Sequence, residues 1–331
     1  MSQTFCNISV TYQIKLKGSN TMKKPLILAV AAMTLAAGAQ AESKFYGKMN
    51  VSTSYDDSSE ALALTSNASR LGVKGSDDIG STKVIYQAEF ELAVDDGYGT
   101  DVDEDDGTDT DTDTNTLKPR DTYVGLSYGD MGTVKMGIMD TPLKKSQGKF
   151  DLFNDVIDMK NVLDGENRLG NSVNYTTAKM GAVQASVTAI LGEGSSDGYS
   201  ASVVFKEGDI YAAVAFDTNL PGKETETFRA TAIYTMGDMR FGALINNVDT
   251  ADTAAGGDEL GFALNASMKM GKNTAKVQFE SGDQKTSGAT NIKAGADHKL
   301  AKATKAFAYV SQFDNDAGDA FGFSIGLEHK F

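Results

Sequence analysis

Apolar and polar residues alternate with a period of two over most of the chain. In the segment 82–94, one face carries Val84 and Phe90, and the other carries Gln87 and Glu89. A period of two is typical of a β-strand whose two faces meet different surroundings. Because the alternation recurs from residue 44 to the last residue, we predict an all-β chain.

The breaks in this pattern divide the chain into an even number of strands. Short connections such as 207–209 and 271–273 alternate with longer polar ones such as 247–259 and 281–291. This arrangement indicates antiparallel neighbours with small turns at one end and large loops at the other, as in outer-membrane barrels. We predict sixteen strands, at 44–56, 69–76, 82–94, 120–129, 133–139, 170–178, 182–191, 199–206, 210–217, 226–236, 239–247, 259–270, 274–281, 290–300, 304–313 and 320–331.

A soluble β-sandwich is the alternative architecture for such a pattern. Its apolar faces would fill a shared core with large side chains. Here the polar face is charged over many consecutive strands, and the apolar face includes many Ala and Gly residues. A sheet of this length exposes two edges unless it closes, and lipid makes closure compulsory. We therefore predict a 16-stranded antiparallel transmembrane β-barrel, which leaves an aqueous interior.

The N-terminal segment indicates export. Residues 22–41 combine Lys23 and Lys24, an apolar run and the small-x-small end Ala39-Gln40-Ala41. This is the pattern of a secretory signal peptide. We interpret residues 1–21 as an extension from an upstream start codon, so that the mature chain is 42–331.

Composition excludes several classes of function. The only cysteine, Cys6, precedes the predicted cleavage site, so the mature chain has no thiol for disulfides, catalysis or metal binding. Its 27 basic and 45 acidic residues give a net charge of −18, since the leader holds four lysines and no acid. That charge argues against nucleic-acid binding. His298 and His329 are far apart, and we predict no catalytic residues, no metal site and no cofactor.

Three segments and the C-terminal residue carry a family resemblance. The segments are 69–80 (SRLGVKGSDDIG), 123–142 with its Gly125, Gly132 and Asp140-Thr141-Pro142, and 168–175 (RLGNSVNY). With the terminal Phe331 they resemble the general diffusion porins of the Gram-negative outer membrane. The resemblance implies a homotrimer of 16-stranded barrels, each with a third loop folded into its pore. It also implies that Phe331 is read by the outer-membrane assembly machinery.

The same resemblance implies which residues form the pore constriction. The third loop would be about 141–165. A transverse electric field would arise between its acidic residues and those basic residues of the early strands that the alternation turns toward the lumen, that is, residues on the inward phase. The expected basic side is Lys48, Arg70 and Arg168, and the expected acidic side is Asp151, Asp155 and Asp158.

Four other residues refine this expectation. Ile138 stands where the family often has a basic residue, which would thin the basic side. Arg120 has the lipid-side phase and is interpreted as a rim residue. Arg229 and Arg240 point inward on the far wall, where they would tune conductance.

The segment 95–115 contains ten acids and no base. Its spacing fails the EF-hand pattern, because the twelfth residue from Asp101 is Thr112. A solvated extracellular loop is favoured. Loose binding of divalent cations that bridge to lipopolysaccharide stays open.

The predicted function is passive diffusion of small hydrophilic solutes and ions across the outer membrane, with mild cation preference because of the acidic charge. A channel selective for sugars or phosphate is one alternative. It needs an aromatic ladder or a lysine cluster, and lumen-phase aromatics are few, Tyr46 and Tyr211 among them. A non-conducting structural or adhesin barrel is the other alternative.

Overall fold

The computed structural model describes residues 43–57, 60–95, 117–193, 196–220, 222, 224–250 and 257–331. Residues 41–331 form one compact unit. The predicted leader 22–41, the segment 1–21 and nearly all of the acidic segment 95–115 lie outside the described residues. Within the described part of the chain, no helix is long and apolar enough to cross a membrane.

One antiparallel sheet contains all the strands. Their bounds are β1 Lys44–Asp56, β2 Ala61–Ser66, β3 Ser69–Ile79, β4 Thr82–Leu92, β5 Leu117–Pro119, β6 Thr122–Ser127, β7 Thr133–Asp140, β8 Arg168–Thr176, β9 Val183–Ile190, β10 Gly198–Glu207, β11 Ile210–Thr218, β12 Thr225–Met236, β13 Met239–Thr250, β14 Asp258–Met270, β15 Asn273–Gly282, β16 Ala289–Ala301, β17 Thr304–Asn315 and β18 Gly318–Lys330. A 3₁₀ helix, η1 Gly129–Met131, lies in the turn between β6 and β7.

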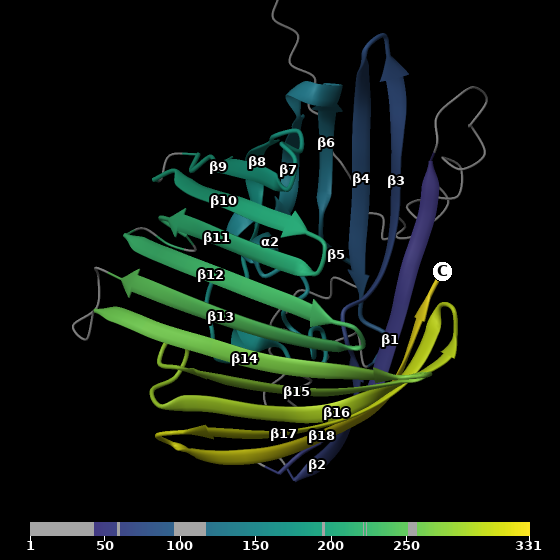
Figure 1. Cartoon of the computed structure of the whole chain (residues 1–331), viewed down its shortest axis with the longest axis vertical. Coiled ribbons are helices and arrows are strands. Elements are labelled where there is room, and N and C mark those ends of the chain that lie inside the picture. The colour runs from purple at the N-terminus through teal and green to yellow at the C-terminus, as the bar shows by residue number, and fades with distance from the viewer. Residues whose placement is uncertain are drawn as a thin grey trace, which may run out of the picture. The chain divides into compact units, whose positions relative to one another are not determined.

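The sheet closes on itself as a barrel. Strands that follow one another in sequence pair side by side, as Figure 1 shows for β10 to β18, and β1 pairs with β18 to complete the ring. The eighteen described strands correspond to only sixteen positions around the barrel, because two positions are each shared by two strands. Both β2 and β3 pair with β1, and both β5 and β6 pair with β4, so each couple is one interrupted strand. The barrel therefore has sixteen strands, as predicted.

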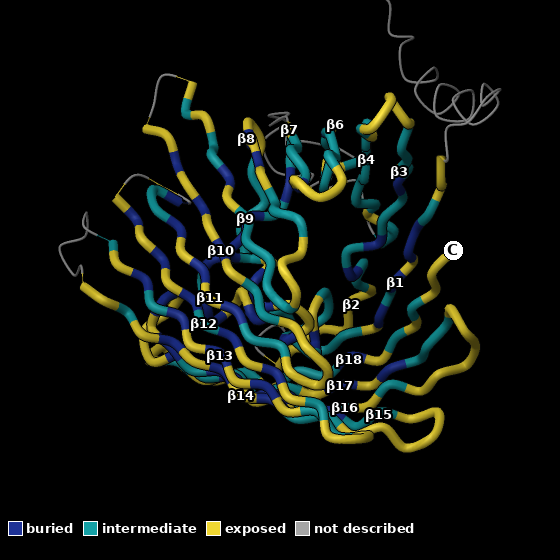
Figure 2. Tube along the Cα trace, turned by 45° about the horizontal axis from the view of Figure 1, so that its top comes forward, coloured by how far each residue is buried: buried dark blue, intermediate teal, exposed yellow. Residues whose placement is uncertain are grey.

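Burial along the strands is the reverse of that in a soluble protein. On β12, Thr227 and Arg229 are buried, while Phe228 between them is 42 % exposed. Figure 2 shows the same alternation of buried and exposed residues along β11 to β14. Large apolar side chains on the outside and polar side chains inside suit a barrel surrounded by acyl chains, because lipid has no hydrogen-bonding partners to offer.

The predicted strand bounds agree with the observed ones to within a few residues, with one omission. The second strand of the barrel starts at Ala61 rather than at residue 69, because β2 precedes β3 across an irregular step at Asn67 and Ala68. The alternation in 304–313 does not by itself decide which side chains point inward, because Phe307 and Tyr309 alternate with Ala308 and Val310. In the structure, Phe307 and Tyr309 are buried inside and Ala308 and Val310 are exposed outside.

The long connection between β7 and β8 has its own compact structure. It contains helix α2 Pro142–Ser146, capped by the Thr141 side chain, and the 3₁₀ helix η2 Met159–Asn161, capped by Asp158. Phe150, Met159 and Leu163 pack against inward side chains of β12, β13 and β14. This connection, residues 141–167, is called the neck loop below.

Candidate functional site

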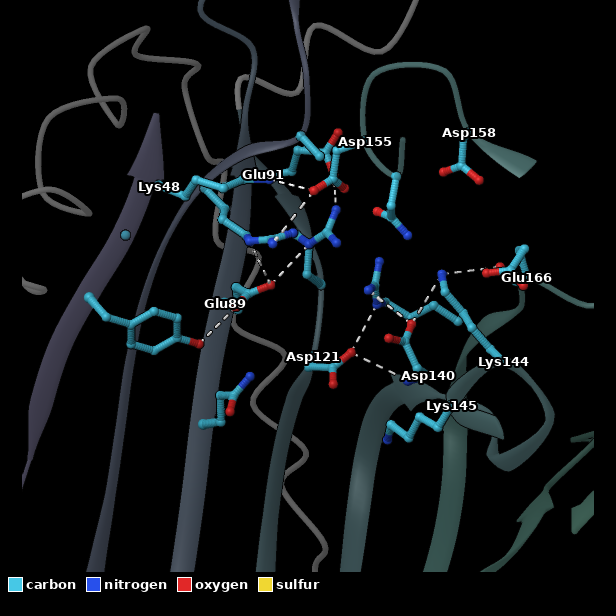
Figure 3. Close-up of a pocket in the computed structure, with 18 of the residues that line it drawn as sticks. Lys48, Glu89, Glu91, Asp121, Asp140, Lys144, Lys145, Asp155, Asp158 and Glu166 are labelled. Carbon is cyan, nitrogen blue, oxygen red and sulfur yellow. Dashed lines mark hydrogen bonds and ion pairs between the residues drawn. The ribbon is translucent and has the colours of Figure 1, made fainter. Parts of the chain in front are cut away.

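A charged cavity of about 1100 Å³ lies between the inner faces of β1 and the strands from β3 to β8 and one side of the neck loop. Figure 3 shows how charged side chains from both sides point into it. Ten basic and seven acidic side chains line it. The basic ones are Lys44, Lys48, Arg70, Lys74, Arg120, Lys144, Lys145, Lys160, Arg168 and Lys330, and the acidic ones are Glu89, Glu91, Asp121, Asp140, Asp155, Asp158 and Glu166.

Three of the six predicted constriction residues meet at one point of this cavity. Lys48 Nζ is 2.5 Å from Asp155 Oδ2, and Arg70 Nη2 is 3.8 Å from the same oxygen. Lys48 and Arg70 are direct neighbours on β1 and β3. Burial alone would raise the pKa of Asp155, but the charges of Lys48 and Arg70 and the hydrogen bond from Lys48 hold that pKa below its ordinary value.

Arg120 was expected at the lipid-side rim, and the structure places it in the cavity instead. Its side chain is only 12 % exposed and forms ion pairs with Glu89, at 2.9 Å, and with Glu91. Arg120 thus adds a cation on the side of the cavity where Ile138 leaves none.

A bulge explains why the phase of Arg120 was wrong. β4 pairs Phe90 with Pro119, but it pairs Gln87 with Tyr123. Three residues of β4 are therefore matched by four residues of the partner strand. One extra residue in a strand reverses which face the next side chain meets, and such bulges commonly redirect side chains at barrel rims and functional sites.

Arg168 joins a second group of charges, away from Asp155. Its Nε lies 2.9 Å from Asp121 and its Nη2 lies 2.9 Å from Asp140, which also lies 3.3 Å from Lys144 (Figure 3). Here too the pairing slips by one residue, because two residues of β7 from Gly137 are matched by three of β8. The predicted basic side of the cavity is thus spread over two ion-pair groups.

The other two predicted acids occupy different environments. Asp158 lines the cavity, and burial together with the charge of Asp151 raises its pKa. Asp151 is not among the lining residues. Its carboxylate accepts hydrogen bonds from the backbone amides of Phe153 and Met159 and from the Gln278 side chain, so it holds the neck loop in shape.

Arg229 and Arg240 point inward as expected, but both contact the neck loop. Arg229 is fully buried and donates to Glu166 at 2.6 Å and to the backbone oxygen of Asp164. Arg240 donates to the backbone oxygen of Lys149. Burial raises the pKa of Glu166 even though the charge of Arg229 opposes that shift.

Several lining lysines have no carboxylate partner among the described residues. They are Lys44, Lys74 and Lys145, and all three are exposed to the cavity or its turn-side opening. Lys74 and Lys44 are direct neighbours across β3 and β1, and Lys74 Nζ lies 4.9 Å from the ring centre of Tyr46. Over the whole lining, ten basic side chains stand against seven acidic ones, an excess of three.

The sequence contained a signal for some of the residues that were not predicted. Glu89 and Glu91 lie on the charged face of their strand next to Arg70, so the alternation already turned them inward. Asp121, Asp140 and Glu166 gave no such signal, because they sit beside a bulge or in the neck loop. In the described part of the chain, no three His, Cys, Asp or Glu side chains are grouped so as to hold a metal ion.

A closed barrel with an apolar exterior and a water-accessible charged interior defines the class of an outer-membrane channel. The family model of Gram-negative porins matches residues 28–318, so the chain belongs to that family. No curated protein matches the chain in a sequence comparison.

Solved porin structures share the fold. One is the anion-selective porin from Comamonas acidovorans, with 20 % identity over 88 % of this chain and all of that chain, and a TM-score of 0.70. The trimer form of OmpT from Vibrio cholerae is 15 % identical over 88 % of this chain and all of that chain, with a TM-score of 0.63. A mutant of Rh. blastica porin is 17 % identical over 87 % of this chain and all of that chain, with a TM-score of 0.62.

Proposed function

We propose that this outer-membrane channel passes small hydrophilic solutes and ions by passive diffusion, and that the charged cavity is its neck. The single observation that carries the proposal is the meeting of Lys48 and Arg70, on the barrel wall, with Asp155 of the neck loop in the lining of the cavity. Charges of both signs along the cavity order the water beside them. An apolar solute would have to displace that water, which makes its passage unfavourable.

The neck loop narrows the passage in this proposal. Its hydrogen bonds run to inward side chains of well-separated strands, such as Ser200 on β10 and Lys293 on β16. A segment tied to inward side chains on several strands lies within the lumen and reduces its cross-section. Lys48 and Arg70 would then meet Asp155 beside the remaining passage, which Arg168 and Asp158 also line, with Asp151 fixing the loop.

The charge of the neck favours anions over cations in this proposal. Cation preference was predicted from the total charge, and the lining does not support it, since ten basic side chains outnumber seven acids. Charges close to a narrow passage act on a permeating ion more strongly than distant ones, which salt screens within about 8 Å. The anion-selective name of the Comamonas porin agrees with this preference.

Planar-bilayer recording of the purified oligomer tests the proposal. We expect open, water-filled conductance and a reversal potential in a KCl gradient that indicates weak anion preference. Arg70→Gln should shift the permeability ratio toward cations by about twofold, since one charge at 4 Å is worth about 1 kcal/mol in water before screening. The control Lys302→Gln makes the same charge change at an exposed turn and should leave the ratio unchanged. Absence of any conductance would point to the non-conducting barrel instead.

The partners proposed for the channel follow the family. We propose that the channel is a homotrimer in the outer membrane, in contact with lipid and lipopolysaccharide. We also propose that the outer-membrane assembly machinery recognises its C-terminal residue, Phe331. The trimeric form of the OmpT neighbour supports the oligomer. Crosslinking of the detergent-solubilised protein should trap a species of three chains, and a purely monomeric product would contradict it.

A further inference from the structure

A second cavity, of about 730 Å³, lies on the loop side of the neck. It is bounded by the ends of β1, β2, β16, β17 and β18 and by the neck loop. Val156 and Asn161 of the neck loop line both cavities. The two cavities therefore adjoin the same part of the neck loop. We call the second cavity the mouth.

The chemistry of the mouth differs from that of the neck. None of the described residues that line it is basic, and its only charged residues are Asp56 and Asp319. Its uncharged polar lining consists of hydroxyl and amide side chains, namely Ser54, Tyr55, Thr65, Asn161, Asn291, Ser311, Asn315 and Ser324. An anion finds no counter-charge there, whereas hydroxyl and amide groups both donate and accept hydrogen bonds.

An aromatic ring stands among these polar groups. Phe313 is on the inward phase of β17, like Phe307 and Tyr309, and it packs with one side against the apolar cluster of the neck loop. A half-buried ring beside hydroxyl and amide groups offers an apolar surface with polar groups around it. Binding sites for small organic molecules commonly combine these two elements.

Asn291 shows that hydrogen-bonding capacity in the mouth is unused. It lies between Glu280 and Phe313 in the sheet and is only 2 % exposed. Its Oδ1 atom has no hydrogen-bond partner among the described residues. A buried polar atom without a partner is unfavourable. A rotation of the Asn291 side chain toward the cavity would let a solute hydroxyl satisfy it.

We propose that the mouth is a weak binding site for neutral polyhydroxylated solutes, that is, sugars or polyols, before they enter the neck. The apolar CH face of the solute lies on Phe313, and its hydroxyls bond to Asn291 and to serine hydroxyls such as Ser311. Binding remains weak because the site is open and shallow, which allows the solute to leave toward the neck. This goes beyond non-selective diffusion, because one class of solute would bind weakly at a defined site in the channel.

Sucrose titration of the single-channel current tests the proposal. With sucrose in both compartments, we expect current interruptions that saturate with concentration. A polyethylene glycol of the same hydrodynamic size should lower the current without saturation. Phe313→Leu keeps the packing against the neck loop but removes the ring, and should weaken the apparent sucrose affinity about fivefold. Asn291→Ala should weaken it about threefold.

Matched controls separate this inference from the proposed function. Phe241→Leu removes an aromatic ring that is 39 % exposed on the outer phase of β13, and should leave the sucrose affinity unchanged. Open-channel conductance and ion preference should be the same in all three variants, which also reports correct folding. A conducting channel with no saturable sucrose effect overturns the mouth site alone, as does equal weakening by Phe241→Leu. Loss of conductance in the unmodified protein would overturn the proposed function.

Discussion

The two walls of the barrel use the same charged residue types in opposite ways. On the early strands, Arg70 and Arg168 keep 25 % and 19 % of their side chains exposed and face the neck. On the late strands, Lys293 and Glu280 form an ion pair in which both side chains are fully buried. The neck loop makes the difference, because it covers the late wall and leaves most of the early wall open to water. The exception is Lys48, which Asp155 of the loop contacts and whose side chain is 4 % exposed.

This contrast separates two roles for inward charges. A charge that the neck loop covers holds the loop, as Lys293 does through the backbone oxygen of Ile157 and Lys276 through that of Leu152. A charge that the loop leaves open faces the permeating solute. The inward phase of a strand therefore does not by itself identify a residue of the conduction path.

The largest expected effect is loss of the covered pair. Lys293→Met leaves Glu280 buried without a counter-charge, and removal of one partner of a buried pair costs about 3–5 kcal/mol. We expect a lower free energy of unfolding and a noisier channel, since the loop loses an anchor. Urea unfolding in lipid vesicles, followed by circular dichroism, measures the first effect.

The double variant Lys293→Met with Glu280→Met is the control for that change. Replacing both partners by apolar side chains removes the uncompensated charge, so most of the lost stability should return. Equal unfolding of the single variant and the unmodified protein would show that the late wall does not depend on this pair.

A smaller effect is expected from pH within the neck. The raised pKa of Asp158 means that it takes up a proton at higher pH than Asp155, whose pKa is lowered. As the pH falls from 7, the neck should lose the charges of Asp158 and Glu166, whose pKa values are both raised, before that of Asp155. Each loss should move the permeability ratio toward anions by about twofold.

Reversal potentials recorded between pH 7 and pH 3 measure these two steps. Asp158→Asn should reduce only the change at higher pH, where Glu166 still contributes, and Asp155→Asn should reduce only the change at lower pH. A single step that both variants remove would contradict the separate environments of the two carboxylates.

The smallest effect is expected at an exposed ion pair of the same chemistry. Lys83 Nζ lies 2.8 Å from Asp78 Oδ1, and the two side chains are 56 % and 72 % exposed. Exposed pairs contribute about 0–1 kcal/mol. Asp78→Asn should therefore leave the urea midpoint of unfolding nearly unchanged. A loss of stability as large as that of Lys293→Met would show that burial does not explain the difference between the two ion pairs.

Strand alternation made most of the barrel predictable. Its period identifies which side chains share a face, so the sixteen strands and the inward phase of Lys48 and Arg70 followed from local order alone. Arg120 escaped the same reasoning, since a bulge adds one residue and leaves no mark in the pattern of apolar and polar positions. The strand β2 was missed because its apolar residues adjoin a short irregular step.

The sequence by itself determined that the chain forms a closed, two-sided barrel, because most strands repeat the same local alternation and lipid requires a closed sheet. Only the tertiary structure decided which inward charges face water and which lie beneath the neck loop. That choice depends on where residues 141–167 pack, and their contacts reach side chains more than one hundred positions away along the chain, such as Gln278 and Lys293. No local period records contacts of that length.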